Sequence, residues 1–106
     1  MAVHQLDIFQ AIADPSRRQI LQMLTKDSYN INSICENFEM SRPAVSKHIK
    51  ILQAAGFVSI REIGRERYCT LNEEGFNKIR EWMNYFDRFW TSRLKKLETV
   101  LNRKKH

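Results

Sequence analysis

The residues of this chain that could do chemistry gather in a short basic segment, SRPAVSKHIKIL, at residues 41–52. Apolar residues recur there at helical spacing, and the opposite face carries cationic and hydrogen-bonding side chains. The apolar positions are Val45, Ile49 and Leu52, and the outward positions are Arg42, Ser46, Lys50 and Gln53, with Ala44 and Lys47 beside them. Arginine can hold guanine through two hydrogen bonds, serine and glutamine can read base edges, and lysine pairs with phosphate. A helix over 42–55 therefore suits the major groove of DNA, although a solvated surface helix would show the same pattern.

Ser41 and Ala44 add two features to this helix. Ser41 is expected to cap its N-terminus, where free backbone N–H groups form a phosphate site. The small Ala44 side chain would let the helix approach DNA closely.

A second basic element follows directly, in FVSIREIGRERYCTL at residues 57–71. Two alternating β-rich runs flank a polar turn at Gly64, which predicts an antiparallel hairpin. Its tip, residues 61–67, holds Arg61, Arg65 and Arg67. Arginine can enter a narrow minor groove or hold flanking phosphates. The tip therefore fits the wing of a winged helix, and its alternative is a charged edge that prevents aggregation.

The elements that must position these residues can be read from spacing and caps. Helices are expected over 4–13, 15–26 and 31–38, with a loop at 27–30. Asp14 and Pro15 suit the start of the second helix, and Gly56 suits a left-handed exit from the fourth. The predicted fold class is mainly α with a small β-hairpin (α+β), a winged helix-turn-helix in the order α-α-α-α-β-β-α.

The last expected element is one long helix over 73–104, capped by Asn72 and roughly 45 Å long at about 30 residues. Its apolar residues recur every three or four positions, at Phe76, Ile79, Met83, Phe86, Trp90, Leu94, Leu97 and Leu101, and a second apolar line holds Trp82, Tyr85 and Phe89. A helix that is apolar on two sides must bury both, and a second copy of the chain is the simplest cover for one of them. A generous intramolecular core or a small-molecule pocket among the aromatics are the alternatives.

Composition narrows the class of protein. The 106 residues suffice for one domain, 1–106, and 42% hydrophobic with 28% charged residues is typical of a soluble globular protein. We see neither a membrane-spanning run nor a signal peptide, so a cytoplasmic location is expected. The net charge of +6 is concentrated in residues 42–67 and 93–106, which favours an anionic partner such as nucleic acid or a lipid surface. Two cysteines are too few for a disulfide framework.

Three segments together resemble the ArsR/SmtB-type winged-helix repressors: FQAIADPSRRQILQML (9–24), SRPAVSKHIKILQAAGFV (41–58) and REIGRERYCTLNEEG (61–75). The resemblance extends from about residue 5 to residue 101 and implies a homodimeric bacterial transcription factor, usually a repressor, with the fourth helix in the major groove. It also implies that the first and last helices form the dimer interface, for which we select Leu6, Phe9, Trp82, Phe86, Phe89, Trp90 and Leu97. Two recognition helices related by a two-fold axis predict a near-palindromic operator.

Many members of this family sense metals, but the ligands do not carry over to this sequence. The Cys-x-Cys pair of the best-known site falls at Asn30 and Asn32, and Cys35 is a lone thiol. The last helix has no histidine, and His4, His48 and His106 are scattered. We therefore expect no metal and no cofactor. His48 is expected to be partly buried with a hydrogen-bond partner and Cys69 to face inward, and a redox role for either cysteine stays open.

The function that these features favour is sequence-specific DNA binding by a transcriptional regulator, most simply a repressor. A winged-helix protein-interaction module is the first alternative, although such modules usually lose the outward basic residues that remain here. A redox- or ligand-responsive regulator is the second. An enzyme is not expected, because the sequence has no Ser-His-Asp arrangement, no phosphate-binding glycine loop and no paired carboxylates in an apolar setting.

Overall fold

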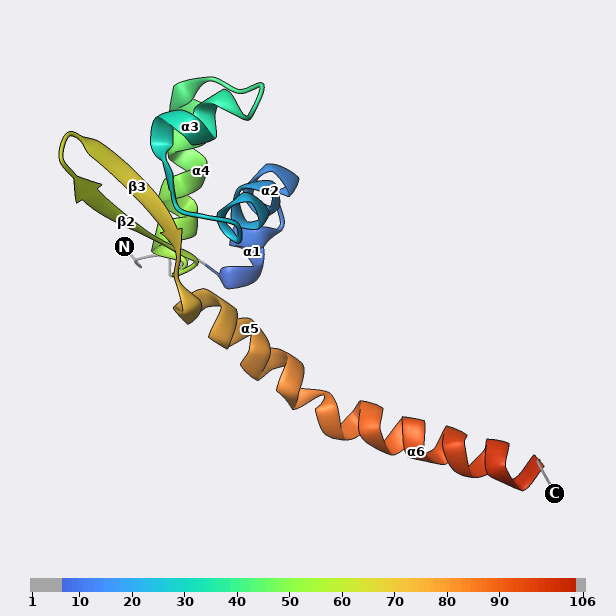
Figure 1. The fold of residues 1–106 in the computed structure, drawn as a ribbon. Helices are drawn as coiled ribbons and strands as arrows, with labels where there is room; N and C mark the ends of the chain where they lie inside the picture. The colour runs from blue at the N-terminus through green and yellow to red at the C-terminus, as the bar shows by residue number, and fades with distance from the viewer. Residues whose placement is uncertain (1–6, 105–106) are drawn as a thin grey trace.

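The computed structural model describes residues 7–104. In this range six helices and three short strands follow one another, and Figure 1 shows α4 with the hairpin on one side and α1 and α2 on the other. Their bounds are α1 Ile8–Ile12, α2 Pro15–Leu24, β1 Tyr29–Asn30, α3 Ile31–Glu36, α4 Arg42–Ala54, β2 Val58–Ile63, β3 Glu66–Leu71, α5 Glu73–Tyr85 and α6 Asp87–Lys104. Leu6, predicted for the dimer interface, and His4 and His106 lie outside the described residues.

Helix starts follow the capping chemistry predicted from the sequence. The Asp14 carboxylate accepts hydrogen bonds from the N–H groups of the next turn, and Pro15 occupies the first helical position of α2. The Ser41 hydroxyl accepts from Ala44 N at the start of α4, and the Asn72 side chain accepts from Glu74 N at the start of α5. Each cap satisfies a backbone donor that has no partner inside its helix.

The core lies where α2, α3 and α4 meet the inner side of the small sheet. Val45, Ile49 and Leu52 are buried, as their spacing predicts, so one face of α4 is fixed and the opposite face is presented to solvent. The buried hydrophobic residues of the described range are Ala11, Ile20, Leu21, Leu24, Ile34, Val45, Ile49, Leu52, Ala55, Phe57, Val58 and Cys69. The orientation of α4 therefore follows from its apolar stripe.

The hairpin forms as predicted and has one strand more than expected beside it. The sheet order is β1-β3-β2, and both pairings are antiparallel. The prediction of a loop over 27–30 was wrong at its second half, because Tyr29 and Asn30 pair with Cys69 and Tyr68 along the other edge of β3. The chain turns at Gly64, whose φ of 65° suits glycine.

A tight junction joins α4, β2 and α5. Gly56 has a φ of 83°, as predicted for the exit of α4, and Phe57 N donates to Leu52 O at 2.9 Å, which is the Schellman pattern. Asn72 N donates to Phe57 O and Gly75 N donates to Gly56 O, both at 2.8 Å. The Phe57 ring is fully buried and leaves no room for a side chain on Gly75.

The single long helix predicted over 73–104 is in fact two helices. Phe86, with φ −96° and ψ −6°, ends α5, and its N–H donates to Met83 O in a tighter turn. The helical hydrogen-bond pattern resumes in α6, where Trp90 N donates to Phe86 O. No glycine or proline marks the break, and the apolar spacing continues across it. Figure 1 shows α6 extending away from the body, and the overall extents are 69 × 37 × 24 Å. None of the described helices is long and apolar enough to cross a membrane.

We predict that Gly75→Ala destabilises the protein. At an unobstructed position inside a helix, alanine is more stabilising than glycine. A Cβ on Gly75, however, would lie 2.7 Å from Phe57 Cδ1, which is closer than van der Waals contact. Overpacking of this kind costs about 1–3 kcal/mol in the free energy of unfolding. Urea denaturation at matched protein concentration measures it, with Asn77→Ala, at an exposed position of the same helix, as the control. Equal stability of the two variants would contradict the prediction.

Candidate nucleic-acid interface

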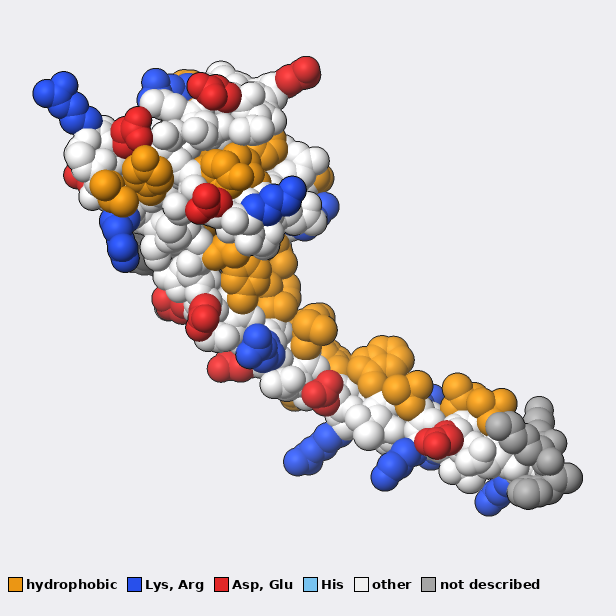
Figure 2. Space-filling view, viewed as in Figure 1, with side chains coloured by type: hydrophobic (Ala, Val, Ile, Leu, Met, Phe, Trp, Pro, Cys, Tyr) orange, Lys and Arg blue, Asp and Glu red, His pale blue; other side chains and the backbone are white. Residues whose placement is uncertain are grey.

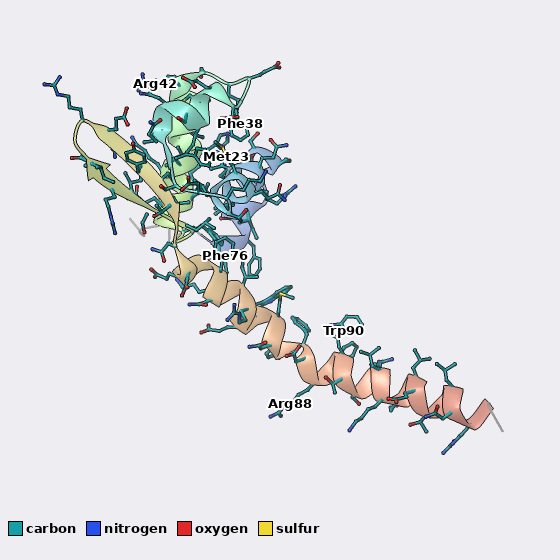
Figure 3. The ribbon with its side chains drawn as sticks, viewed as in Figure 1. Met23, Phe38, Arg42, Phe76, Arg88 and Trp90 are labelled. Atoms are coloured by element: carbon teal, nitrogen blue, oxygen red, sulfur yellow. The ribbon has the colours of Figure 1, made fainter. Side chains whose placement is uncertain are left out.

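The outer face of α4 presents its cations to solvent. Arg42, Lys47 and Lys50 are exposed, and Ala44 and Ser46 are half-buried. Arg42 belongs to the first turn of α4, at the end of the helix that lies beside α3 (Figure 3). The helix therefore offers a positively charged surface with small residues between the cations.

A cleft of about 240 Å³ lies between this helix end and the hairpin. Three arginines from two elements, Arg42 of α4 with Arg65 and Arg67 of the hairpin, share its wall. Its full lining is Asn30, Ile31, Asn32, Arg42, Ser46, Arg65, Glu66 and Arg67. A neighbouring hollow of about 160 Å³ brings Arg67 together with Lys50. Positive charge lining a concave surface favours a polyanion.

The register of the hairpin separates its three arginines. Glu62 pairs with Arg67 and Arg61 pairs with Tyr68, so Arg61 and Arg67 project from opposite faces of the sheet. Arg67 shares the face of Cys69, which packs on the core beside α4. The structure therefore brings Arg65 and Arg67 together with Arg42 and places Arg61 on the other side, a distinction that the sequence analysis did not make.

Sequence reasoning gave no role to Arg17 and Arg18, and the structure gives them one. The Arg17 guanidinium donates to Ala11 O and Gln10 O at 2.5 and 3.1 Å, and that of Arg18 donates to Ile12 O and Ala13 O at 2.8 and 3.0 Å. The two side chains thus cap carbonyls at the end of α1, of which Gln10 O also accepts from Ala13 N. No local pattern in the sequence gives these contacts, because they depend on how α1 and α2 pack.

Arg17 also connects this end of α1 to the inner side of α4. Its Nη1 lies 3.3 Å from His48 Nδ1, and His48 is half-buried. The expectation that His48 is a partly buried histidine with a polar partner is confirmed. One guanidinium therefore links α1, α2 and α4.

The positions at which metal-sensing family members carry their ligands have other roles in this chain. Asn30, at the place of one family cysteine, caps α3 by accepting from Ser33 N at 2.7 Å, and Asn32 lines the cleft. Cys69 faces inward as predicted, and its burial raises the pKa of the thiol to about 11. Cys35 is half-buried on α3. Within residues 7–104 no three His, Cys, Asp or Glu side chains are grouped as a metal site would require.

A second surface, the α5–α6 apolar face, consists of large side chains without a cover. Phe9 of α1 and Trp82 of α5 meet edge to face at 4.9 Å, and Trp82 meets Phe86 at 5.0 Å. Trp82, Trp90 and Leu97 are between 52% and 59% exposed. Figure 2 shows hydrophobic side chains following one side of both helices, and Figure 3 shows Trp90 and Arg88 projecting from opposite sides of α6. A contiguous exposed apolar surface of this kind marks an interaction site.

Known proteins share these features. The profile described as "Bacterial regulatory protein, arsR family" matches residues 14–59. The transcriptional repressor SdpR of Bacillus subtilis is 35% identical over 80 residues, which cover 76% of this chain and 89% of SdpR. The chain belongs to the ArsR family. It is a DNA-binding transcriptional regulator of the ArsR/SmtB type and not an enzyme, which confirms the resemblance seen in its sequence.

Further relatives agree with this ArsR-family assignment. An HTH-type transcriptional regulator of Mycobacterium tuberculosis is 36% identical, over 81% of this chain and 78% of its own. The crystal structure of a possible transcriptional regulator for arsenical resistance superposes with a TM-score of 0.69 at 36% identity, covering 90% of this chain and 96% of the other. That of an ArsR family transcriptional regulator gives 0.73 at 32% identity, covering 79% and 92%. The predicted winged helix-turn-helix fold is confirmed.

The burial of Cys69 predicts a difference in reactivity between the two cysteines. The attacking species is the thiolate, and a pKa of about 11 leaves Cys69 protonated near neutral pH. Iodoacetamide at pH 8 should label the half-buried Cys35 in the folded protein and reach Cys69 only after unfolding. Peptide mass spectrometry over a time course measures both. Labelling of Cys69 at the rate of Cys35 under native conditions would contradict this picture.

Proposed function

We propose that this protein is a homodimeric repressor that binds a near-palindromic operator, with α4 in the major groove and the wing, residues 61–67, on the minor groove or the adjoining backbone. The convergence of Arg42, Arg65 and Arg67 on one cleft is the observation that carries the proposal. A helix in the major groove and a wing beside it must straddle a phosphate strand, and this cleft lies between the two elements. Arginines are suited to that strand because guanidinium matches phosphate geometry.

The proposal divides the work among the basic residues. The outward face of α4, with the exposed Arg42 and Lys50 and the half-buried Ser46, reads the edges of bases, and Lys47 contacts phosphate. Ser41 and Ala44 let the start of the helix approach the backbone closely. In the wing, Arg65 and Arg67 face the strand next to α4, and Arg61 reaches phosphates from the opposite side of the sheet. The helix then specifies sequence, and the wing sets position.

A second copy of the chain is the proposed cover for the α5–α6 apolar face. The aromatic and leucine side chains of this face are typical of interface anchors, and Phe9 joins α1 to the same surface through Trp82. The proposed contacts are Phe9, Trp82, Phe86, Phe89, Trp90 and Leu97, with Leu6 a sequence prediction beyond the described range. A two-fold axis through this interface would present two α4 helices to major grooves about 34 Å apart.

Repression is the outcome that the relatives favour. SdpR is named a transcriptional repressor, and a 31% identical relative in Staphylococcus xylosus is named an arsenical resistance operon repressor. A dimer seated on its operator would exclude other proteins from the same DNA. The asparagines at the cysteine-pair positions argue for a signal other than a thiolate-bound metal.

DNA binding is tested by gel-shift titration on the protein's own upstream region. Affinity should fall steeply with salt, with a log–log slope of about 0.9 for each phosphate neutralised. Arg42→Ala should cost about 1–3 kcal/mol and relax specificity at one base pair. Arg65→Ala should weaken binding to all sequences alike and reduce the salt slope by about 1. A flat salt response would favour the protein-interaction alternative, and equal loss of specificity in both variants would contradict the division of roles.

Dimerisation is tested at Trp90 and Arg88, which lie on opposite sides of α6. Sedimentation velocity should show the 12.7 kDa chain at twice its mass at micromolar concentration. Trp90→Glu should give monomers, because a carboxylate would be buried without a partner in the interface. Arg88→Glu changes the charge more but should leave the dimer intact. Monomeric wild-type protein, or dissociation by both variants alike, would overturn the proposed interface.

A further inference from the structure

Glu66 puts a negative charge beside the wing arginines: it is one of the residues that line the cleft of Arg42, Arg65 and Arg67, although by the strand register its side chain projects from the sheet face opposite to that of Arg67. It stands between Arg65 and Arg67 in the chain, and a bare carboxylate there would repel the phosphate backbone. An ion pair with one of these arginines would be the simplest explanation. Among residues 7–104, however, the one ion pair within 4.0 Å is Arg17–Asp14.

The carboxylate of Glu66 is held instead by two neutral donors. Its Oε2 accepts a hydrogen bond from Tyr68 Oη at 2.9 Å and another from Asn30 Nδ2 at 3.2 Å. The bond to Glu66, together with its charge, raises the pKa of Tyr68 above the ordinary phenol value. Hydrogen bonds to an ionised acceptor are stronger than those between neutral groups. The Glu66 carboxylate is therefore hydrogen-bonded to Asn30 and Tyr68, and it makes no ion pair within 4.0 Å with the neighbouring Arg65 or Arg67.

Asn30 joins this network to the helices. While its Nδ2 donates to Glu66, its Oδ1 accepts from Ser33 N at 2.7 Å and caps the first turn of α3. One side chain amide thus connects the wing to the helix that precedes α4. The backbone pairing of β1 with β3 ends at Asn30 and Tyr68, so Glu66 extends the attachment two residues closer to the tip.

The rest of the wing has no comparable attachment. All side chains of residues 61–67 are exposed, and among these seven described residues Glu66 is the one whose side chain makes a hydrogen bond. The turn at Gly64 and Arg65 follows immediately. Without the Glu66 contacts, the position of the tip relative to α4 would depend on the two-strand ladder alone, and isolated two-stranded ribbons are flexible.

We propose that Glu66, held by Asn30 and Tyr68, is a positioning residue that fixes the wing arginines relative to α4. This inference rests on the proposed DNA-binding function. It predicts a change in DNA affinity opposite in sign to the change that electrostatics alone predicts. If charge alone mattered, removing this carboxylate would strengthen DNA binding. If positioning matters more, removing it weakens binding, because the wing must then be ordered when DNA binds.

The matched control is Glu62, an exposed carboxylate on β2 of the same wing, opposite Arg67 and without a side-chain hydrogen bond in the described structure. Glu62→Ala should tighten binding to operator DNA by about threefold through loss of a like charge. Glu66→Ala removes the same charge and should instead weaken binding about three- to tenfold. Tightening by Glu66→Ala equal to that by Glu62→Ala would overturn the proposal.

Two conservative variants separate geometry from charge. Glu66→Gln keeps an acceptor oxygen and loses the charge, so its affinity for operator DNA should be at or above that of the wild type. Tyr68→Phe keeps every charge and loses one hydrogen bond, so it should weaken binding about two- to fivefold. Wild-type affinity in Tyr68→Phe, or a loss in Glu66→Gln as large as in Glu66→Ala, would count against the positioning role.

A measurement without DNA keeps the inference separable from the proposed function. Backbone ¹⁵N relaxation of Gly64 and Arg65 reports the order of the wing tip on the ps–ns timescale. Order parameters at both amides should fall in Glu66→Ala and Tyr68→Phe and stay unchanged in Glu62→Ala. Unchanged order in all three variants would overturn the positioning role even if DNA binding is established. If the wild type ignored DNA while the order parameters changed as expected, the proposed function would fail and the structural role of Glu66 would stand.

Discussion

The arrangement of the α4–wing surface and of the α5–α6 apolar face depends on the packing of the buried Phe57. Its N–H closes the end of α4, its carbonyl accepts from Asn72 at the start of α5, and its ring meets that of Phe76 at a centroid distance of 5.0 Å. The ring also packs directly against Gly75. Because Gly75 has no side chain, the start of α5 can lie this close to the base of the hairpin. The direction in which α5 leaves the body is thereby tied to the direction of α4. A rearrangement of one of these elements would have to disturb the other.

This tie matters because the two proposed surfaces act at different places. DNA would meet α4 and the wing, whereas a second copy would meet α1, α5 and α6. An operator with fixed half-site spacing demands that two α4 helices be held at a fixed separation. Two rigid connections serve that demand: the Phe57 junction, and the Arg17 guanidinium that spans the end of α1 and His48 on α4.

Much of the fold could be predicted because local chemistry and tertiary packing agree in it. Ser41, Pro43 and Gly56 bound α4, and its apolar spacing states which face is buried. Three features could not be predicted. The strand β1 exists because the edge of β3 is available to it, the break at Phe86 lies inside an uninterrupted apolar repeat, and the capping of α1 by arginines depends on how α1 and α2 pack. For the candidate site, spacing identified the basic residues, but only the strand register shows that Arg67 faces α4 and Arg61 does not.

The extended shape of the chain is a further argument that a second chain packs against the apolar side of α6. The radius of gyration is 19.5 Å, whereas a compact chain of this length has about 13 Å. The excess comes from α6, whose described side chains are all exposed and whose apolar residues occupy one side while Arg88 lies on the other. Most helical stability in proteins comes from packing of an apolar face, and none of the described side chains of α6 is buried within its own chain. The same residues that expose hydrophobic surface in one chain would therefore stabilise the helix once a second chain buries them, so folding of α6 and dimerisation would be a single coupled event.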